Sequence, residues 1–344
     1  MPRETSTVTV GDYRPQESEA ALAIERACPQ GRTFRLTFAR PTFHRRAETF
    51  AERRIVAARA GGRLAGVLAV AIKPVTWRGA PARAAFLFDL RVHPHMQGRG
   101  ITSRLAREAL SWAFARAEIA YLYTVAENEA VRLTARRFRT ARDVGGYRYL
   151  VVPTAGAREQ RAGLASSFDQ VHEALCAARP PFDFYARPSP APGYVGSWLW
   201  RSAGSTAGCS AWDHRETLAE TVAEVPWAYR ALSAVDRSWA WRAAGWPRIP
   251  RPGETVRSWY VFDFFAHDGA SARALLRHVA AEARARGIDY LYLIHQPGDV
   301  GIDAVRADHP RLFAPVVPYR LLACVPSGPP PAPFAHPYVD VRDL

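Results

Sequence analysis

The chain has 344 residues, of which 48% are hydrophobic, and this composition allows two domains with real cores. The net charge is +14, but alanine and proline are abundant, and all but one of the 46 basic residues are arginine, Lys73 being the exception. The charge therefore indicates a nucleic-acid partner only weakly, and no helix-turn-helix or zinc-finger spacing accompanies it. No run of about 20 apolar residues is present, so we expect no membrane-spanning helix.

The N-terminal sequence and the cysteines indicate a cytoplasmic protein. The first residues, MPRETSTVTVGDYRP, lack the apolar run of a signal peptide. The four cysteines are scattered through the chain without the spacing of a metal or redox site. We therefore expect reduced thiols and no bound metal.

Strand and helix patterns alternate through residues 1–152. Strands are predicted at 6–15, 84–91, 120–128 and 145–152, and a hairpin is predicted at 54–72. Helices are predicted at 17–28, 101–117 and 129–138, with a helical region around 42–51. Beyond these, a helix is predicted at 165–178, followed by a proline-rich loop. Residues 331–344 contain too much proline for a regular element and are predicted to form a tail.

A loop with the sequence VHPHMQGRG, at 92–100, joins the predicted strand at 84–91 to the predicted helix at 101–117. Free backbone N–H groups point out of a helix start, and the helix dipole favours an anion there. Gly98 and Gly100 let the backbone approach a ligand closely, and Arg99 adds positive charge. The loop is therefore predicted to bind phosphate.

An internal repeat connects the two halves of the chain. The segment FLFDLRVH at 86–93 resembles YVFDFFAH at 260–267, and IAYLYTV at 119–125 resembles IDYLYLI at 288–294. The interval between the two strands is five residues shorter in the second copy, and the missing residues fall at the glycine-arginine loop. We predict a duplicated domain whose second copy has lost the anion-binding loop, with chance similarity of two apolar strands as the alternative.

The segment LRVHPHMQGRGITSRL resembles the acetyl-CoA signature of the GNAT acyltransferase superfamily. That signature is Gln or Arg, two residues, Gly, one residue, then Gly or Ala, after a strand that ends in Val-x-Pro. Gln97, Gly100 and Thr102 occupy the three positions, and Thr102 departs from the pattern. The resemblance covers residues 8–152 well and 153–328 weakly.

The resemblance implies an α/β (α+β) fold of two tandem GNAT-like domains, each a mixed, mostly antiparallel sheet flanked by helices. The expected boundaries are 1–152 for the domain with the acyl-CoA site, 153–330 for the degenerate copy and 331–344 for the tail. It implies acyl-CoA as the donor and direct transfer to an amine. The implied donor-binding residues are Leu90, Arg91, Val92, Gln97, Gly98, Arg99, Gly100, Ile101, Thr102, Ser103 and Asn128.

Such a transfer needs a base, an N–H group for the oxyanion and an acid for the leaving thiolate. Asp89 is the preferred base because it lies in an apolar strand, where burial would raise its pKa, and a structural aspartate is the alternative. The family's tyrosine acid is missing, since Thr134 or Ala135 lies where it would fall and Arg137 replaces the motif's glycine. Tyr123 or Tyr147 could replace it, with packing as the alternative role.

The acceptor is poorly specified by the second half, where eight of the ten tryptophans lie. Aromatic residues recur near helical spacing through 227–246, which favours core packing of the second copy. The alternative is an apolar wall that faces an acceptor or a long acyl chain. Asp213, His214 and Glu216 could bind an amine and are too loosely grouped to be metal ligands.

The favoured hypothesis is an acyl-CoA-dependent N-acyltransferase, more specifically an N-acetyltransferase, acting on a small-molecule amine in natural-product biosynthesis or resistance. One alternative takes its acyl group from a long-chain acyl-CoA or an acyl carrier protein. The other is a non-catalytic CoA-binding module. No nucleic-acid partner is expected.

Overall fold

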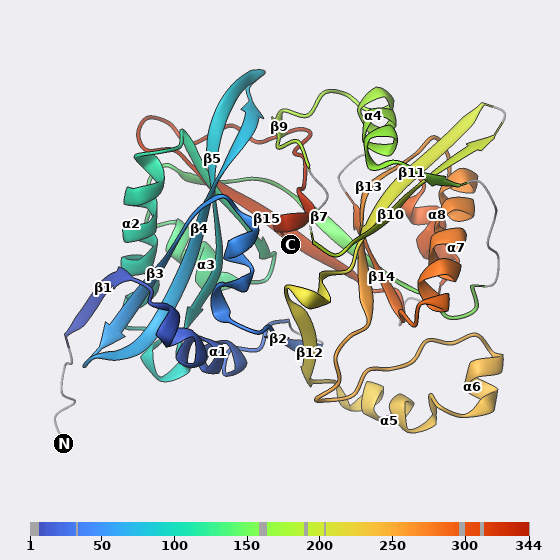
Figure 1. Cartoon of the computed structure of the whole chain (residues 1–344), viewed down its shortest axis with the longest axis horizontal. Helices are drawn as coiled ribbons and strands as arrows, with labels where there is room; N and C mark the ends of the chain where they lie inside the picture. Colours follow the sequence, from blue (N-terminus) through green and yellow to red (C-terminus); the bar gives the residue numbers. More distant parts are fainter. Residues whose placement is uncertain are drawn as a thin grey trace.

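The structure is a computed structural model that describes residues 7–31, 34–157, 164–188, 192–202, 204–295, 300–309 and 313–343. Two α/β halves lie side by side and share one continuous sheet of thirteen strands (Figure 1). The predicted fold class, an α/β (α+β) fold with a mixed, mostly antiparallel sheet flanked by helices, is confirmed. Within the described residues, no helix combines the length and the apolar character needed to cross a bilayer.

The first half contains seven strands and three α-helices in the described chain. The strands are β1 (Val8–Asp12), β2 (Arg35–Ala39), β3 (Glu52–Ala60), β4 (Arg63–Trp77), β5 (Ala80–Val92), β6 (Ile119–Val125) and β7 (Ala141–Pro153). The helices are α1 (Ser18–Arg26), α2 (Ile101–Phe114) and α3 (Glu129–Ala135). Short 3-10 turns occur at Pro15–Glu17, Phe43–Arg45, Ala47–Thr49 and Pro94–Met96.

The second half contains the remaining strands and helices. The strands are β8 (Ala165–Ser166), β9 (Phe184–Tyr185), β10 (Tyr194–Ser202), β11 (Ser205–Trp212), β12 (Ala219–Glu224), β13 (Ser258–Ala266), β14 (Tyr290–His295) and β15 (Val316–Cys324). The helices are α4 (Phe168–Ala178), α5 (Trp227–Val235), α6 (Trp239–Ala243), α7 (Gly269–Ala285) and α8 (Ile302–Ala307). Short 3-10 turns occur at His214–Glu216 and Val341–Asp343.

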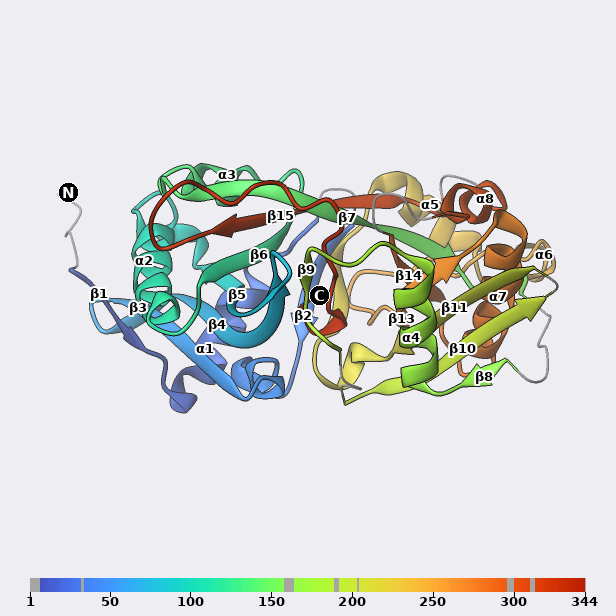
Figure 2. The ribbon, with the colours of Figure 1, turned by 90° about the horizontal axis from the view of Figure 1, so that it is seen from above.

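The two halves exchange a strand at the centre of the sheet. The strand order is β1-β3-β4-β5-β6-β15-β7-β14-β13-β11-β10-β8, so β15 lies between β6 and β7, and β7 pairs with β14 of the second half. Figure 2 shows β7 and β15 running across the junction. Separately, β2 and β12 form a two-stranded sheet that also joins the halves. Residues 316–324, which we expected within the second copy, therefore complete the sheet of the first.

The apolar residues of α2 and α7 fix the layers. Helix α2 buries Leu105, Ala109 and Ala113 against one face of β3, β4 and β5. In the second half, α7 buries Leu275 and Val279 against the sheet. In the second half, α4 and an aromatic core cover the opposite face of the sheet. Both halves therefore have one long helix, α2 or α7, packed on one face of the sheet.

The C-terminal segment is not the free tail that its proline content predicts. Tyr338, Val339 and Val341 are buried, and the chain end lies between the two halves (Figure 1). Asp340 and Asp343 both form ion pairs with Lys73 on β4, each at 2.6 Å. Residue 344 of the predicted tail lies outside the described residues.

A shared backbone irregularity supports the duplication. Asp89 on β5 and Asp263 on β13 have φ of +53° and +52°, values that an aspartate in a strand rarely adopts. Each lies at a bulge, where the pairing of β5 with β4 and of β13 with β11 shifts register. Two chance apolar strands would not be expected to repeat this conformation at the same aspartate.

Candidate active site

The glycine-arginine loop leads directly into the start of α2, as predicted. Gly98 and Gly100 have φ of +76° and +73°, in the left-handed region that favours glycine. Gly100 is the N-cap residue, and within the described chain no side chain caps this helix. The N–H groups of the first helical turn are therefore available to an anionic ligand.

The strands beside this helix separate at the same end of the sheet. β5 and β6 pair only from Ala84–Phe86 to Ile119–Tyr121, although β5 continues to Val92 and β6 to Val125. On its other edge, β5 has its bulge opposite Leu68, between the pairs Ala69–Phe88 and Val67–Arg91. The part of β5 that contains Leu90 to Val92 therefore offers backbone groups toward the gap between the two strands.

The predicted loop residues follow directly after β5, at the end where it has separated from β6. The amide of Gln97 donates to the Val92 carbonyl over 3.2 Å and fixes the loop against the strand end. Arg99 is exposed, whereas Ile101 is buried beneath the helix start and anchors it. Thr102 is partly exposed in the first turn. The structure thus brings the consecutive residues of the motif together, because the motif is a single turn of chain.

Two of the residues predicted to bind the acyl donor, Ser103 and Asn128, form hydrogen bonds within the protein. The Ser103 hydroxyl accepts from the Arg137 guanidinium over 3.1 Å, which brings that arginine to the start of α2. Asn128 lies at the start of α3, where its side-chain oxygen accepts from the backbone N–H of Val131 over 3.3 Å. Sequence reasoning treated Arg137 only as a departure from the family motif, whereas the structure makes it a candidate phosphate contact.

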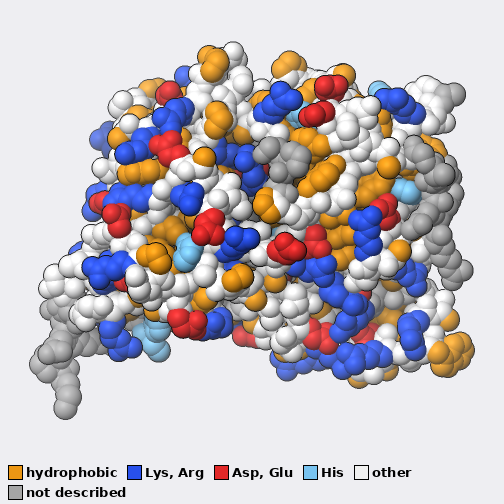
Figure 3. Space-filling view, in the orientation of Figure 1, with side chains coloured by type: hydrophobic (Ala, Val, Ile, Leu, Met, Phe, Trp, Pro, Cys, Tyr) orange, Lys and Arg blue, Asp and Glu red, His pale blue; other side chains and the backbone are white. Residues whose placement is uncertain are grey.

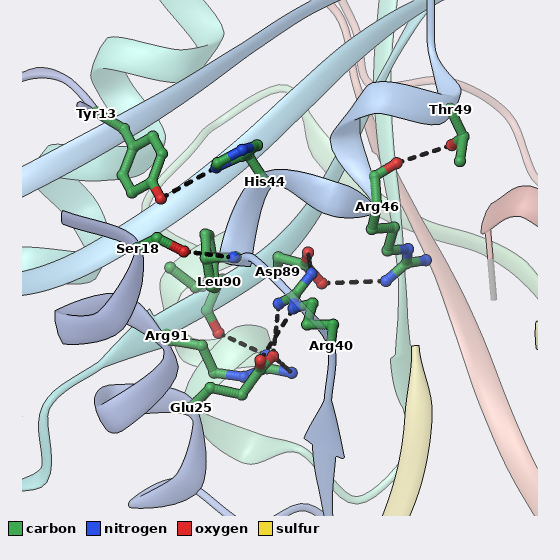
Figure 4. A network of polar contacts seen from close by, with 11 residues as sticks. Tyr13, Ser18, Glu25, Arg40, His44, Arg46, Thr49, Asp89, Leu90 and Arg91 are labelled. Carbon is green, nitrogen blue, oxygen red and sulfur yellow. Dashed lines mark hydrogen bonds and ion pairs between the residues drawn. The ribbon is translucent and has the colours of Figure 1, made fainter. Parts of the chain in front are cut away.

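Asp89 does not have the raised pKa that we expected for a base. Its carboxylate accepts from Arg40 at 2.6 Å and from Arg46 at 3.1 Å (Figure 4). Burial alone would raise the pKa of Asp89, but the charges of these guanidinium groups outweigh it and lower the pKa to about 2. The expectation was wrong because the arginines, distant in sequence, converge on this strand.

Asp89 belongs to a buried ion cluster that joins β5 to α1 and the segment after β2. Arg40 also binds both oxygens of Glu25, at 3.0 and 2.6 Å, and Arg91 lies 3.6 Å from the same carboxylate. The side chain of Arg91 is thus turned toward Glu25 (Figure 4). Only the backbone of Arg91 is then left to face an acyl-CoA. The cluster shapes the bulge, and Asp89 supports the strand.

Replacing Asp89 with asparagine is expected to lower the free energy of unfolding by about 3–5 kcal/mol, as is typical when a buried ion pair loses one partner. Because the folded-state pKa of Asp89 is lowered to about 2, its stabilisation is present above about pH 4 and is lost as the pH falls through 2. Urea denaturation across this range measures both effects.

The matched control for this variant is Asp143→Asn. Asp143 pairs with Arg320 at 2.5 Å on the surface, with 39% of its side chain exposed, so its removal should cost less than about 1 kcal/mol. Equal effects of the two substitutions would show that the buried cluster does not stabilise the fold.

A continuous group of tyrosines covers the face opposite α2, across the junction of the two halves. Tyr147 stacks on Tyr319 with a centroid distance of 4.9 Å, and Tyr123 lies edge-on to Tyr147 at 5.1 Å. The group continues through Tyr149 to Tyr260 and Tyr292. Burial raises the pKa of both Tyr123 and Tyr147 well above its usual value, so both hydroxyls hold their protons at neutral pH.

The far end of this tyrosine face carries buried polar groups from the second half. Tyr260 donates to Glu220 over 3.0 Å, and burial raises the pKa of that carboxyl. The ring of His214 lies 4.5 Å from the ring of Tyr260, and neither ring nitrogen has a partner among the described residues. Burial lowers the pKa of His214 to about 3, so the ring is neutral.

The remaining members of the predicted amine-binding group do not join His214. Asp213 pairs with Arg215 at 2.5 Å, and Glu216 is exposed. Glu220 contacts Tyr260, the aromatic neighbour of His214, and was not anticipated, because it lies in the short strand β12, which the sequence analysis did not predict.

A buried charge cluster that sequence reasoning missed lies where β5 and β6 separate. Asp343 accepts from the Tyr121 hydroxyl over 2.7 Å, and Tyr121 is paired with Phe86, the last pair before the strands diverge. Burial raises the pKa of Asp343, against the charge of Lys73. Asp340, which also pairs with Arg342, has its pKa lowered by these cations despite its burial. The one lysine of the chain, within an apolar run, was the available signal.

The equivalent opening in the second copy is filled. β13 and β14 pair only up to Val261–Leu293, but Tyr338 inserts beyond that point and its hydroxyl donates to Asp263 over 2.6 Å. His172 of α4 binds the other oxygen of Asp263 at 2.8 Å. Only a small pocket remains there, between the two strands, α4 and the C-terminal segment.

The start of α7 also differs from the start of α2. Asp268 caps α7, its carboxylate accepting from the Ser271 N–H over 2.8 Å and from the Ser205 hydroxyl over 2.6 Å. At the start of α7, a carboxylate therefore binds N–H groups of the kind that are free at the start of α2. This carboxylate would repel a phosphate.

Comparison with known proteins agrees with this architecture. Residues 20–138 match the model of the Acetyltransferase (GNAT) family. Two structures of Saccharomyces cerevisiae N-myristoyltransferase with bound myristoyl-CoA are similar in fold. One has a TM-score of 0.56 at 10% identity, over 97% of this chain and 86% of that chain; the other has 0.55 at 11%, over 96% and 81%.

A third similar structure, a GCN5-related N-acetyltransferase from Anabaena variabilis, has a TM-score of 0.48 at 12% identity, over 92% of this chain and 72% of that chain. No curated protein sequence gives a significant match. The family match spans α2 and the loop before it, where the sheet opens.

Proposed function

We propose that this chain, whose residues 20–138 match the Acetyltransferase (GNAT) family, transfers an acyl group from acyl-CoA to the amine of a small molecule. The observation that carries the proposal is the uncapped start of α2, placed directly beyond the point where β5 and β6 separate. This opening can take the pantetheine arm between the strands while the pyrophosphate meets the helix N–H groups. Arg99 and Arg137 supply positive charge beside it.

The chemistry of the transfer needs few groups. The acceptor nitrogen attacks the thioester carbon, and a backbone N–H of β5 near Leu90 to Val92 stabilises the oxyanion. We assign the base to Asp343, because its pKa is raised and it lies at the Tyr121 end of the opening. Tyr123 or Tyr147 protonates the leaving CoA thiolate, since both hydroxyls lie on this face and hold their protons.

The acceptor is proposed to lie on the tyrosine face. Tyrosine rings bind organic cations through their faces, and the Glu220 carboxyl at the far end adds a polar contact. An amine acceptor with an aromatic or apolar body matches the chemistry of these side chains. We propose that the enzyme acts in the cytoplasm, on an amine of natural-product biosynthesis or on one whose acylation gives resistance.

A turnover assay tests the proposal. Purified protein is incubated with acetyl-CoA and a panel of amines. Release of the CoA thiol is measured with a colorimetric thiol reagent, and the product is identified by mass spectrometry. N-acylated product supports the proposal. Tight CoA binding without turnover on any amine would instead indicate a non-catalytic CoA-binding module.

One observation favours a longer acyl group. One structure of similar fold is a yeast N-myristoyltransferase with bound myristoyl-CoA, and the stacked rings of Phe86 and Phe88 lie on β5 at the point where it separates from β6. Comparing kcat/KM for acetyl-, octanoyl- and myristoyl-CoA distinguishes a short donor from a long one. Transfer only from an acyl carrier protein would select the remaining alternative.

Each chain is expected to bind one donor, in the first half only. In the second half, Asp268 caps the start of α7 and Tyr338 fills the gap between β13 and β14. A CoA pyrophosphate placed there would lose hydrogen bonds to water without gaining enough N–H groups to replace them. Calorimetric titration with CoA should therefore saturate at one per chain. Saturation at two would mean that the second opening is accessible.

A further inference from the structure

We propose that the segment from Trp227 to Arg251, which contains α5 and α6, binds the surface of an anionic lipid bilayer. This segment forms the outer corner of the second half (Figure 1). The proposal is independent of the proposed transfer reaction, since it rests on a surface remote from the α2 loop.

The tryptophans of this segment are exposed, contrary to the core packing that their spacing favours. Trp227 is 82% exposed, Trp239 is 77% exposed and Trp246 is 46% exposed. Val235, 51% exposed, lies in the same segment, so four of the six exposed large apolar side chains of the described chain lie between residues 227 and 251. Such a concentration marks an interaction surface.

Helix α5 presents an apolar stripe to solvent. Trp227, Ala231, Ala234 and Val235 fall on one side of the helix by their spacing, and the last three are exposed together with Trp227. No residue of helix α5 is fully buried, and the side that packs against the second half is the other one, with Tyr229 and Leu232. A helix whose apolar side is unpartnered in the folded chain is suited to lie in the interface of a membrane.

The charge of the segment selects an anionic partner. Five arginines accompany the tryptophans, at 230, 237, 242, 248 and 251, whereas the single acidic residue, Asp236, is buried and accepts from the Ile249 N–H. Among the described residues, Arg230 and Arg242 form no ion pair, and both are exposed. Figure 3 shows apolar side chains at the lower right edge of the molecule beside a group of basic ones.

The surface is held rigidly enough to be presented as a unit. The Trp241 indole donates to the Pro247 carbonyl over 2.8 Å, and Arg251 donates to the Ser233 carbonyl over 2.5 Å. Tryptophan rings favour the depth of lipid headgroups, and arginines are attracted to anionic headgroups. Glu254, 27% exposed, pairs with Arg237 and Arg248, which leaves Arg230 and Arg242 as the exposed arginines without an ion pair among the described residues. The combination of these cations with exposed tryptophans at one corner points to a lipid surface.

Sedimentation with vesicles tests the proposal on the full chain. We expect binding to vesicles of phosphatidylcholine with phosphatidylglycerol, and at least about tenfold weaker binding to phosphatidylcholine alone. Trp227→Ser combined with Trp239→Ser should reduce binding to the anionic vesicles by about tenfold or more. Arg230→Gln combined with Arg242→Gln should also weaken binding and reduce its dependence on salt.

The matched control replaces exposed apolar residues elsewhere, Leu133→Ser with Val300→Ser, which are 53% and 52% exposed. This control should bind vesicles as the unchanged protein does. Absence of vesicle binding by the unchanged protein, or an equal loss in the control, would overturn the proposal. If light scattering shows a dimer that the tryptophan variant dissociates, the surface is an interface between two copies and the proposal is wrong.

Discussion

Gly100→Glu should weaken CoA binding by about 100-fold or more while leaving the fold intact. A side chain at Gly100 would enter open space, since a Cβ there would meet nothing within 4 Å. The effect must therefore come from charge and backbone conformation. The new carboxylate would lie at the start of α2, where it competes for the free N–H groups and repels the pyrophosphate. Calorimetry with CoA measures the loss.

Gly79→Glu is the matched control for this variant. Gly79 lies in the turn between β4 and β5 with φ of +75°, and a Cβ there would also meet nothing within 4 Å. The two substitutions therefore add the same charge and a similar backbone cost, at different places. Equal CoA affinity of the two variants would refute the assignment of the α2 start to the donor. A lower melting temperature in both would measure the backbone cost alone.

The loop could be predicted from sequence because its information is local. Gln97, Gly98, Arg99 and Gly100 are consecutive, and a turn that leads into a helix needs no distant partner to define it. The same holds for the helix start, which the apolar spacing predicts at residue 101 and the structure places at Ile101. The placement of these residues agrees with expectation, and their role in donor binding stays a prediction.

The ionisation of Asp89 could not be predicted, since its partners are distant in sequence. Arg40 and Arg46 are 49 and 43 residues away, and neither belongs to a recognisable motif. An aspartate in an apolar strand has a raised pKa only if no cation reaches it. The number of arginines in this chain made a cation plausible without showing which one.

The positions of β15 and of the C-terminal segment could not be predicted from the sequence either. β15 leaves its own copy to pair with β6, and the last residues fold back onto β4, with Lys73 and Asp343 separated by 270 residues. Proline content predicted correctly that most of residues 331–343 lack a helix or strand, apart from the 3-10 turn at Val341–Asp343, but could not show that part of the segment is buried. Likewise, helical spacing of tryptophans at 227–246 shows that they share a side of a helix, not whether that side is covered.

The buried pair Asp340 and Asp343 distinguishes two roles for neighbouring carboxylates. Asp340 binds both Lys73 and Arg342, which lower its pKa, whereas Asp343 faces Lys73 and the Tyr121 hydroxyl and has its pKa raised by burial. Two such groups with opposite shifts are the arrangement expected where one carboxylate holds structure and the other exchanges a proton.

Asp343→Asn is expected to lower kcat by about 100-fold, with an unchanged affinity for CoA, because the attacking amine loses its base. In the unchanged protein, kcat should fall as the pH drops through the raised pKa of Asp343, so the acidic limb lies above the usual range of an aspartate. The variant should lack that limb. Rates across pH with a saturating amine provide both measurements.

The stability of the same variant separates catalysis from structure. A carboxylate whose pKa is raised on folding contributes stability only at low pH, so its ionised form does not stabilise the protein at neutral pH. Lys73 keeps Asp340 as its partner at 2.6 Å when Asp343 becomes neutral. Asp343→Asn should therefore unfold at the same urea concentration as the unchanged protein near pH 7, unlike Asp89→Asn. A fully active Asp343→Asn protein, or one with the original acidic limb, would remove Asp343 from the reaction.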